Sequence, residues 1–268
     1  LQGYRDLAKL MIKESIHAAP TSGVFRLAPV MSLVATTLAA ATFPCFLAGA
    51  LVPTGDVIVA LYLLALGRFF TALAGLDAAS AFGGLGSSRD VTIAAVAEPV
   101  AVVAILVLAA GVGTTTDGSA LAAGTDGLLA PWRLLAAAAF FLIVLTECAR
   151  VPVDNPATHL ELTMIHEAML LEYSGAELAC ATAAAQVKQT VLLAMLASVF
   201  FPVGMAQSAE PLALLIAVAR FVAKLAARAA LIAIVESSVA KLRLFRVPDF
   251  IGVALGLAIL AYVAREAL

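Results

Sequence analysis

Charged residues are scarce in this sequence, and their scarcity indicates the solvent around the chain. Only 13% of the 268 residues are charged and 63% are hydrophobic, which gives a mean hydropathy of +1.06. A chain with so few polar groups cannot surround its apolar residues with a polar shell that faces water. The composition therefore excludes a soluble globular protein and predicts a chain that lies in lipid.

Two further shortages narrow the class of protein. The net charge is −2 and no basic patch is interleaved with aromatic residues, so we expect no binding of nucleic acid. Cys45, Cys148 and Cys180 lack the short spacings of iron–sulfur and zinc motifs. The chain is therefore expected to hold no metal or cofactor of its own. A basic leader with a cleavage site is also lacking, which predicts no signal peptide.

Long apolar runs are what the sequence has in abundance. A helix needs about 20 apolar residues to cross about 30 Å of hydrocarbon, and the runs lack the alternation of a membrane β-barrel. The sequence predicts an all-α, polytopic transmembrane bundle. About seven helices are expected, near residues 27–53, 58–76, 91–112, 131–147, 188–206, 211–236 and 250–265.

The connections between these runs alternate in charge. One side collects basic residues: Arg5, Lys9, Lys13, Arg26, Arg89, Arg150, Lys188, Lys241, Arg243 and Arg246. The other side carries acids: Asp56, Asp117, Asp126 and Glu210. The positive-inside rule makes the first side cytoplasmic in a plasma membrane, and with it a long acidic loop over residues 147–187. We expect residues 1–268 to form a single integral membrane domain.

Several ionisable residues lie inside the apolar runs, where each costs about 3 kcal/mol and usually has a task. Arg68 lies in the second run, and Glu98 precedes a proline in the third. In the sixth run, four-residue spacing puts three cations on one face of a helix, with an acid at its end: Arg220, Lys224, Arg228 and Glu236. The same pattern is also typical of ion pairs that fix helix packing, or of side chains that reach toward the membrane surface.

Carboxylates gather again between Glu147 and Glu172. Asn155 and Pro156 are typical of a helix start, so a helix is predicted from there to Glu172. Glu161 and Glu172 would then share a side, about 16 Å apart along the axis, which suits a proton relay better than metal binding. Acids on the surface of a membrane protein are usually just solvated, but apolar neighbours here would raise their proton affinity.

The same stretch resembles a known family. Its pattern is similar to the cytoplasmic loop of the complex I subunit 1 family, in the residues Glu147, Arg150, Pro152, Asp154, Pro156, Glu161-Leu162 and Glu172-Tyr173. Residues 153–162 and 165–169 resemble the branch found in formate hydrogenlyase and other group 4 membrane-bound nickel–iron hydrogenases more than respiratory complex I. Residues 86–98 and 245–249 are also similar to family blocks, so the resemblance spans most of the chain.

The sequence departs from the quinone-reducing members of that family. Val153 and Asn155 stand where those members have phenylalanine and leucine, and the spacing from Glu161 to Glu172 is longer by about one helical turn. Quinone contacts are therefore not transferred to this chain. The family has eight spanning helices, so we expect the first of them to precede Leu1.

The resemblance implies a role as the membrane-anchoring and ion-coupling subunit of a formate hydrogenlyase-like oxidoreductase complex. Implied partners are the hydrogenase large and small subunits, which would hold the nickel–iron centre and the iron–sulfur clusters, antiporter-like membrane subunits, and lipid. Candidate proton-relay residues are Glu98, Glu147, Arg150, Asp154, Glu161 and Glu172. The row Arg220, Lys224, Arg228 and Glu236 would hold or pass charge laterally.

Two other functions remain open at this point. One is the quinone-site subunit of a respiratory NADH dehydrogenase, which would have the same fold and a different electron acceptor. The other is a free-standing secondary transporter, although the sequence has no inverted repeat and no matched pair of broken helices. The sequence also leaves open the electron donor, the choice between H⁺ and Na⁺, and whether net pumping occurs.

Overall fold

The computed structural model describes residues 2–16, 21–42, 56–112, 130–154, 164–206 and 210–267. Within these ranges the chain forms α-helices and one 3₁₀ turn, and no β-strand. The elements are α1 (Gln2–Ile12), α2 (Gly23–Thr42), α3 (Val57–Asp77), α4 (Ala81–Val112), α6 (Pro131–Glu147), α7 (His166–Leu170), α8 (Gly175–Ser198), α9 (Pro211–Ser238), η1 (Leu244–Arg246) and α10 (Val247–Glu266).

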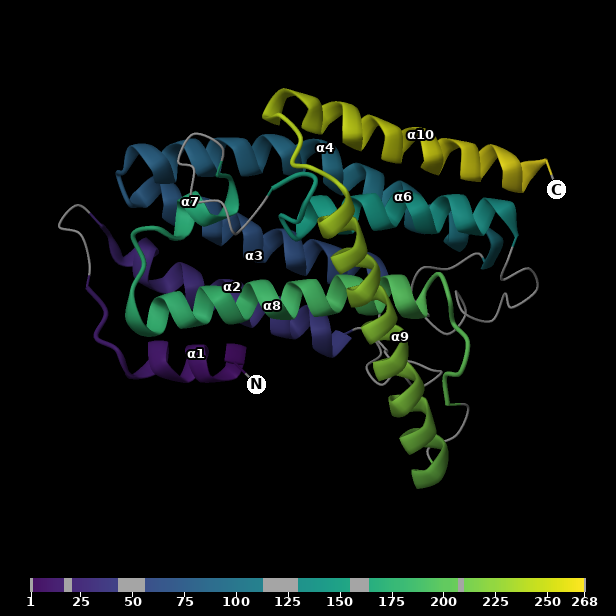
Figure 1. Cartoon of the computed structure of the whole chain (residues 1–268), viewed down its shortest axis with the longest axis horizontal. Coiled ribbons are helices and arrows are strands. Elements are labelled where there is room, and N and C mark those ends of the chain that lie inside the picture. Colours follow the sequence, from purple (N-terminus) through teal and green to yellow (C-terminus); the bar gives the residue numbers. More distant parts are fainter. Residues whose placement is uncertain are drawn as a thin grey trace.

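Most of the long helices run along the long axis of the molecule (Figure 1). Helix α2 packs between α3 and α8, while α4, α6 and α10 pack on one another. Helix α9 crosses the others steeply, and its Pro211 end stands clear of them in Figure 1. The short helix α7 packs on α4, and α1 lies beside α8.

The predicted all-α, multi-pass membrane bundle is confirmed. Five helices are long and apolar enough to cross a membrane: α2, α3, α4, α8, and α10 together with η1. Helix α6 has the predicted bounds and contains 17 residues. Helix α9 contains 28 residues and carries the predicted row of ionisable side chains. Each predicted apolar run thus contributes a helix, although residues 43–53 of the first run lie outside the described residues.

Two helices begin well before the apolar runs that predicted them. Helix α4 starts at Ala81 rather than near residue 91, and α8 starts at Gly175 rather than near residue 188. The early part of α4 is rich in glycine and serine, which have low helix propensity. It is helical because these small residues let α3 and α4 approach closely: a methyl group on Gly83 would come within 3.0 Å of the Gly75 carbonyl oxygen.

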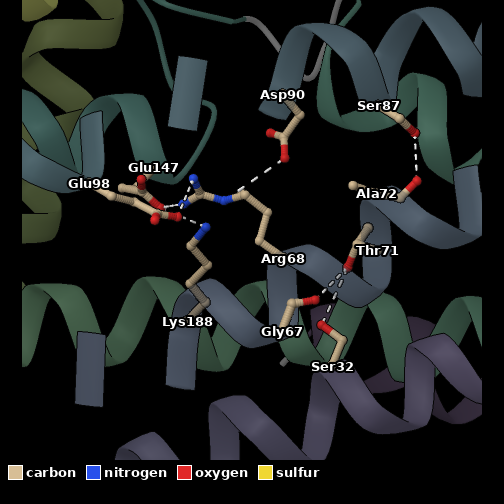
Figure 2. Close-up of polar contacts among 10 residues, drawn as sticks. All are labelled: Ser32, Gly67, Arg68, Thr71, Ala72, Ser87, Asp90, Glu98, Glu147 and Lys188. Atoms are coloured by element: carbon tan, nitrogen blue, oxygen red, sulfur yellow. Dashed lines mark hydrogen bonds and ion pairs between the residues drawn. The ribbon is translucent and has the colours of Figure 1, made fainter. Parts of the chain in front are cut away.

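The glycine run 83–86 lies within α4, just after the turn that follows α3. Gly83 makes a close backbone contact with Gly75 of α3. Ser87 adds to this contact by donating a hydrogen bond to the Ala72 carbonyl at 2.9 Å (Figure 2). The crossing of α3 and α4 therefore fixes the ends of both helices next to α7.

The long helix predicted from residue 155 to Glu172 is wrong at residues 164–165, which are not helical. Helix α7 spans only His166–Leu170, and residues 155–163 lie outside the described residues. Tyr173 accounts for the end of α7, because its ring stacks on Phe25 with centroids 4.0 Å apart and its hydroxyl donates to the Phe25 carbonyl at 2.7 Å. This contact turns the chain toward α2. Residues 148–174 therefore connect α6 to α8.

Candidate functional site

A cluster of charged side chains lies inside the bundle, where α3, α4, α6 and α8 meet (Figure 2). Arg68 of α3 is at its centre. The guanidinium forms ion pairs with Glu147 at the end of α6 and with Glu98 of α4, the latter at 3.1 Å. Its Nε atom lies 3.9 Å from Asp90 Oδ2. One arginine thus bridges carboxylates from two helices.

Lys188 enters the same cluster from α8, and its Nζ atom lies 2.9 Å from Glu147 Oε2. The side chains of Glu147, Arg68 and Lys188 are 8%, 10% and 15% exposed. Two cations therefore face three carboxylates, which leaves one excess negative charge when all five groups are ionised. An uncompensated charge is costly in a low-dielectric interior, so the two cations are needed to offset the carboxylates.

Asp90 is the least satisfied carboxylate of the cluster. Its Oδ2 atom is buried and accepts no hydrogen bond from the part of the chain that the structure describes. Asp90 and Glu98 lie eight residues apart on α4, about 12 Å along the axis. The cluster therefore offers carboxylates at two depths of the bundle.

Cavities lie on both sides of Arg68 and Glu147. The larger has a volume of about 70 Å³, and its polar lining comes from Ser32, Thr36, Arg68, Thr71, Asp90, Glu147, His166 and Lys188. The smaller, of about 30 Å³, has Tyr62 and Glu98 in its wall. The Glu98 side chain is 39% exposed, more than the other acids of the cluster. Arg68 and Glu147 thus line both cavities, and the exposed side chain of Tyr62 borders the smaller one.

A second charge network begins three residues after Glu147, in the segment that follows α6. Arg150 donates to Gln189 Oε1 of α8 at 2.8 Å and pairs with Glu236 of α9 at 3.5 Å. Cys148 lies between the two networks, and burial raises the pKa of its thiol to about 11, so the thiol is neutral. Cys148 packs against the apolar core of the bundle.

Asp154 closes the second network. Its side chain is 4% exposed, it pairs with Lys241 Nζ at 2.6 Å, and it accepts the Ile165 N–H at 3.2 Å. The Leu242 N–H donates to the Pro152 carbonyl at 2.8 Å. Asp154 thus ties the segment after α6 both to the start of α7 and to the segment between α9 and α10.

Similarity to known proteins identifies the family of this chain. The family model described as NADH dehydrogenase matches residues 1–265. The chain belongs to the NADH dehydrogenase subunit 1 family. It is 34% identical over 268 residues to hydrogenase-4 component C of Escherichia coli strain K12, covering 98% of this chain and 83% of that protein. It is 32% identical over 272 residues to formate hydrogenlyase subunit 4 of the same organism, covering 98% of this chain and 86% of that protein.

A solved structure shares the fold of this family member. A chain of the membrane-bound sulfane sulfur reductase, an archaeal respiratory membrane complex, superposes with a TM-score of 0.79 at 17% sequence identity. The match covers 97% of this chain and 86% of that one. The identity is too low to carry more than the fold.

The structure brings together some of the residues that the sequence singled out in this family member. Glu98 and Glu147 share the cluster around Arg68, whereas Arg150 and Asp154 belong to the second network. Glu172 lies beyond the end of α7 and is not part of either network. Glu161 lies outside the described residues. Their expected relay roles remain predictions.

The cationic row of α9 is split among different surroundings. Lys224 donates to the Phe201 carbonyl at 2.6 Å, and the Arg228 guanidinium lies over the Phe201 ring at 5.2 Å. Arg220 is exposed, and its side chain passes close to Gly204. Glu236 pairs with Arg150 rather than with the row. The row therefore lies apart from the Arg68 cluster.

Sequence reasoning missed three residues of the inner site: Asp90, His166 and Lys188. Lys188 was assigned to the cytoplasmic surface because α8 was expected to begin there, but it lies thirteen residues into that helix. Asp90 was passed over because it stands beside Arg89 at the expected helix end. The spacing of Asp90 and Glu98 by eight residues, which puts them about 80° apart and so on one side of the helix, is the signal that could have identified Asp90.

Proposed function

We propose that this chain is the membrane-anchoring and ion-coupling subunit of a formate hydrogenlyase-like, energy-converting hydrogenase complex. Similarity along almost the whole chain to hydrogenase-4 component C and formate hydrogenlyase subunit 4 supports the choice of complex. The observation that carries the ion-coupling role is the buried cluster, in which three carboxylates face two cations. The chain would be a subunit of an oxidoreductase complex without a redox centre of its own.

The proposed partners supply the redox chemistry. Hydrogenase large and small subunits would hold the nickel–iron centre and the iron–sulfur clusters on the cytoplasmic side, and antiporter-like membrane subunits would lie beside the bundle. The basic residues on the side of Arg150 and Lys241 support a cytoplasmic position for the connection between α6 and α8 in a plasma membrane. That connection would form the binding surface for the electron-transfer arm.

In the proposed mechanism, electron transfer in the arm changes the charge next to the segment that follows α6. Asp154 and Arg150 are the first residues affected by that change in charge, because they lie in this segment. Glu147 is covalently adjacent to the same segment and belongs to the inner cluster, so the change shifts the proton affinity of the cluster. A proton is then exchanged among Glu147, Asp90 and Glu98, while the Arg68 guanidinium stays positively charged and limits the cost of the carboxylates.

Glu98 is the proposed exit from the cluster. Its carboxylate is more exposed than those of Asp90 and Glu147, and it lines the smaller cavity, next to Tyr62. A carboxylate exposed at membrane depth is unfavourable against lipid. A neighbouring antiporter-like subunit that covers this face would relieve the cost and receive the proton.

The composition of the native complex tests this proposal. The complex should be purified in mild detergent through a tag on this chain, then analysed by intact mass spectrometry and assayed for nickel, iron and flavin. We expect a nickel-containing large subunit, iron–sulfur subunits and no flavin-bearing NADH module. A flavin module without nickel would contradict the proposal and favour the quinone-site alternative. Ion uptake by this chain alone in liposomes would favour the transporter alternative.

A further inference from the structure

A histidine lies in the wall of the larger cavity. Helix α7 places His166 there, together with Asp90 of α4, Glu147 of α6 and Lys188 of α8. Two hydroxyl side chains from α2 and α3, Ser32 and Thr71, line the same cavity and lie 3.4 Å apart (Figure 2). Within the described part of the chain, His166 is thus the residue that brings α7 to the charge cluster.

The position of His166 is fixed by contacts on each side of it. Helix α7 packs so closely on α4 that a methyl group on Gly86 would come within 3.0 Å of the Ala168 side chain and the Ile165 carbonyl. Arg89 donates to the Met164 carbonyl at 3.1 Å, and Asp154 accepts the Ile165 N–H at 3.2 Å. Short helices rarely hold a side chain in place unaided, and here α4 and Asp154 provide the support.

The imidazole is surrounded by groups of both signs. Asp90 faces it from α4, Lys188 from α8, Glu167 from its own helix and Asp154 from the segment after α6. Burial lowers the pKa of His166 below its usual value, and Lys188 acts in the same direction, while the three acids oppose the shift. The ring is therefore neutral near pH 7. A neutral imidazole has one nitrogen that accepts a proton and one that donates.

The cavity has room for water between His166 and the carboxylates. A water molecule occupies about 30 Å³ in the liquid and needs two to four polar partners in a protein interior. A volume of about 70 Å³ lined by carboxylates, hydroxyls and an ammonium group meets both conditions for about two water molecules.

We propose that His166 admits protons from the cytoplasmic side to the Arg68 cluster, through water held in this cavity. One ring nitrogen accepts a proton from water outside the cavity, and the other releases its proton to a cavity water, which protonates Asp90 or Glu147. The imidazole then returns to its original tautomer and can accept the next proton. This inference rests on the proposed function and adds to it the residue through which protons reach the cluster.

The test uses the complete complex reconstituted in proteoliposomes, with hydrogen evolution and proton transport measured together. His166→Ala should lower proton transport at least about tenfold, because positioned proton-transfer groups contribute about 10²-fold to 10⁴-fold to rates. Imidazole added at millimolar concentration should restore transport in this variant, since the truncated side chain leaves space for it. His166→Gln should be equally slow and should not respond to imidazole, because its side chain fills that space.

Glu14→Gln, at an exposed acid in the segment after α1, is the control, and it should transport protons at the wild-type rate with no response to imidazole. Wild-type transport in both His166 variants, or a loss that imidazole leaves unchanged in His166→Ala, would overturn the inference. Glu147→Gln separates the two proposals. If Glu147→Gln abolishes transport while the His166 variants are normal, only the histidine inference fails. If Glu147→Gln is also normal, the proposed function itself fails.

Discussion

Arg68 holds the charge balance of the cluster at the scale of single residues. It contacts three carboxylates, and its side chain is 10% exposed. Arg68→Gln would leave Asp90, Glu98 and Glu147 with Lys188 as the nearest cation, and breaking a buried ion pair in this way costs about 3–5 kcal/mol. We expect a clear drop in the thermal unfolding temperature of the detergent-purified complex subunit.

The control for this prediction removes one acid together with the arginine. In Arg68→Gln/Glu98→Gln one carboxylate fewer remains, so part of the lost stability should return. Equal unfolding temperatures for the single Arg68 variant and the wild type would show that the ion pairs contribute nothing. An unrecovered loss in the double variant would assign the effect to packing of the arginine stem rather than to charge.

The lowered pKa of His166 predicts that the stability of α7 depends on pH. Its pKa is lowered in the folded chain by burial, so below its ordinary pKa of about 6.5 the unfolded chain binds more protons than the folded one. The stabilisation of α7 should therefore be complete above about pH 6.5 and decline as the pH falls below it. Amide hydrogen exchange of residues 164–173, corrected for intrinsic rates, should quicken at pH 5.5 relative to pH 7.5 in the wild type. His166→Gln should lose this dependence.

At the scale of elements, the crossing of α3 and α4 positions the cluster. Gly83→Ala would press a methyl group against the Gly75 backbone, which cannot move as a flexible side chain would. Overpacking of this kind costs about 1–3 kcal/mol. The unfolding temperature should fall, and with it the contact of α4 with α7.

Gly84 supplies the matched control one residue away, because nothing lies within 4 Å of a methyl group added there. Alanine also favours a helix over glycine by about 1 kcal/mol. Gly84→Ala should therefore be neutral or slightly stabilising. A similar loss of stability in both variants would mean that helix flexibility, rather than the close contact with Gly75, explains the glycines.

The elements also show where sequence reasoning succeeds and fails. Apolar runs predicted α6 with its observed bounds, because its sequence is apolar from Leu134 to Leu145 and lies between Pro131 and Glu147. The start of α4 was missed because glycine and serine have low helix propensity, and only the contact with α3 reveals why they are there. The break before α7 was missed because the Ile165 N–H is bound by the Asp154 carboxylate rather than by a helical carbonyl. Local patterns do not contain that contact.

At the scale of the whole molecule, the cluster is assembled from four helices, with residues that range from Arg68 to Lys188 in the sequence. Glu98, Glu147 and Arg68 could each be recognised from the sequence as charges within or beside apolar runs. Their mutual contacts could not, since pairing depends on how the helices pack. Lys188 shows the limit most clearly: the shift in the start of α8 moves it from the membrane surface to an ion pair with Glu147.

The most direct test of the account is proton transport by the complete complex carrying Glu147→Gln. In proteoliposomes supplied with the physiological electron donor, the number of protons transported per hydrogen evolved should fall sharply, because the substitution removes the excess carboxylate of the cluster. Glu14→Gln, an exposed acid in the segment after α1, should keep the wild-type ratio. A wild-type ratio in Glu147→Gln would contradict the claim that the buried cluster couples electron transfer to proton movement.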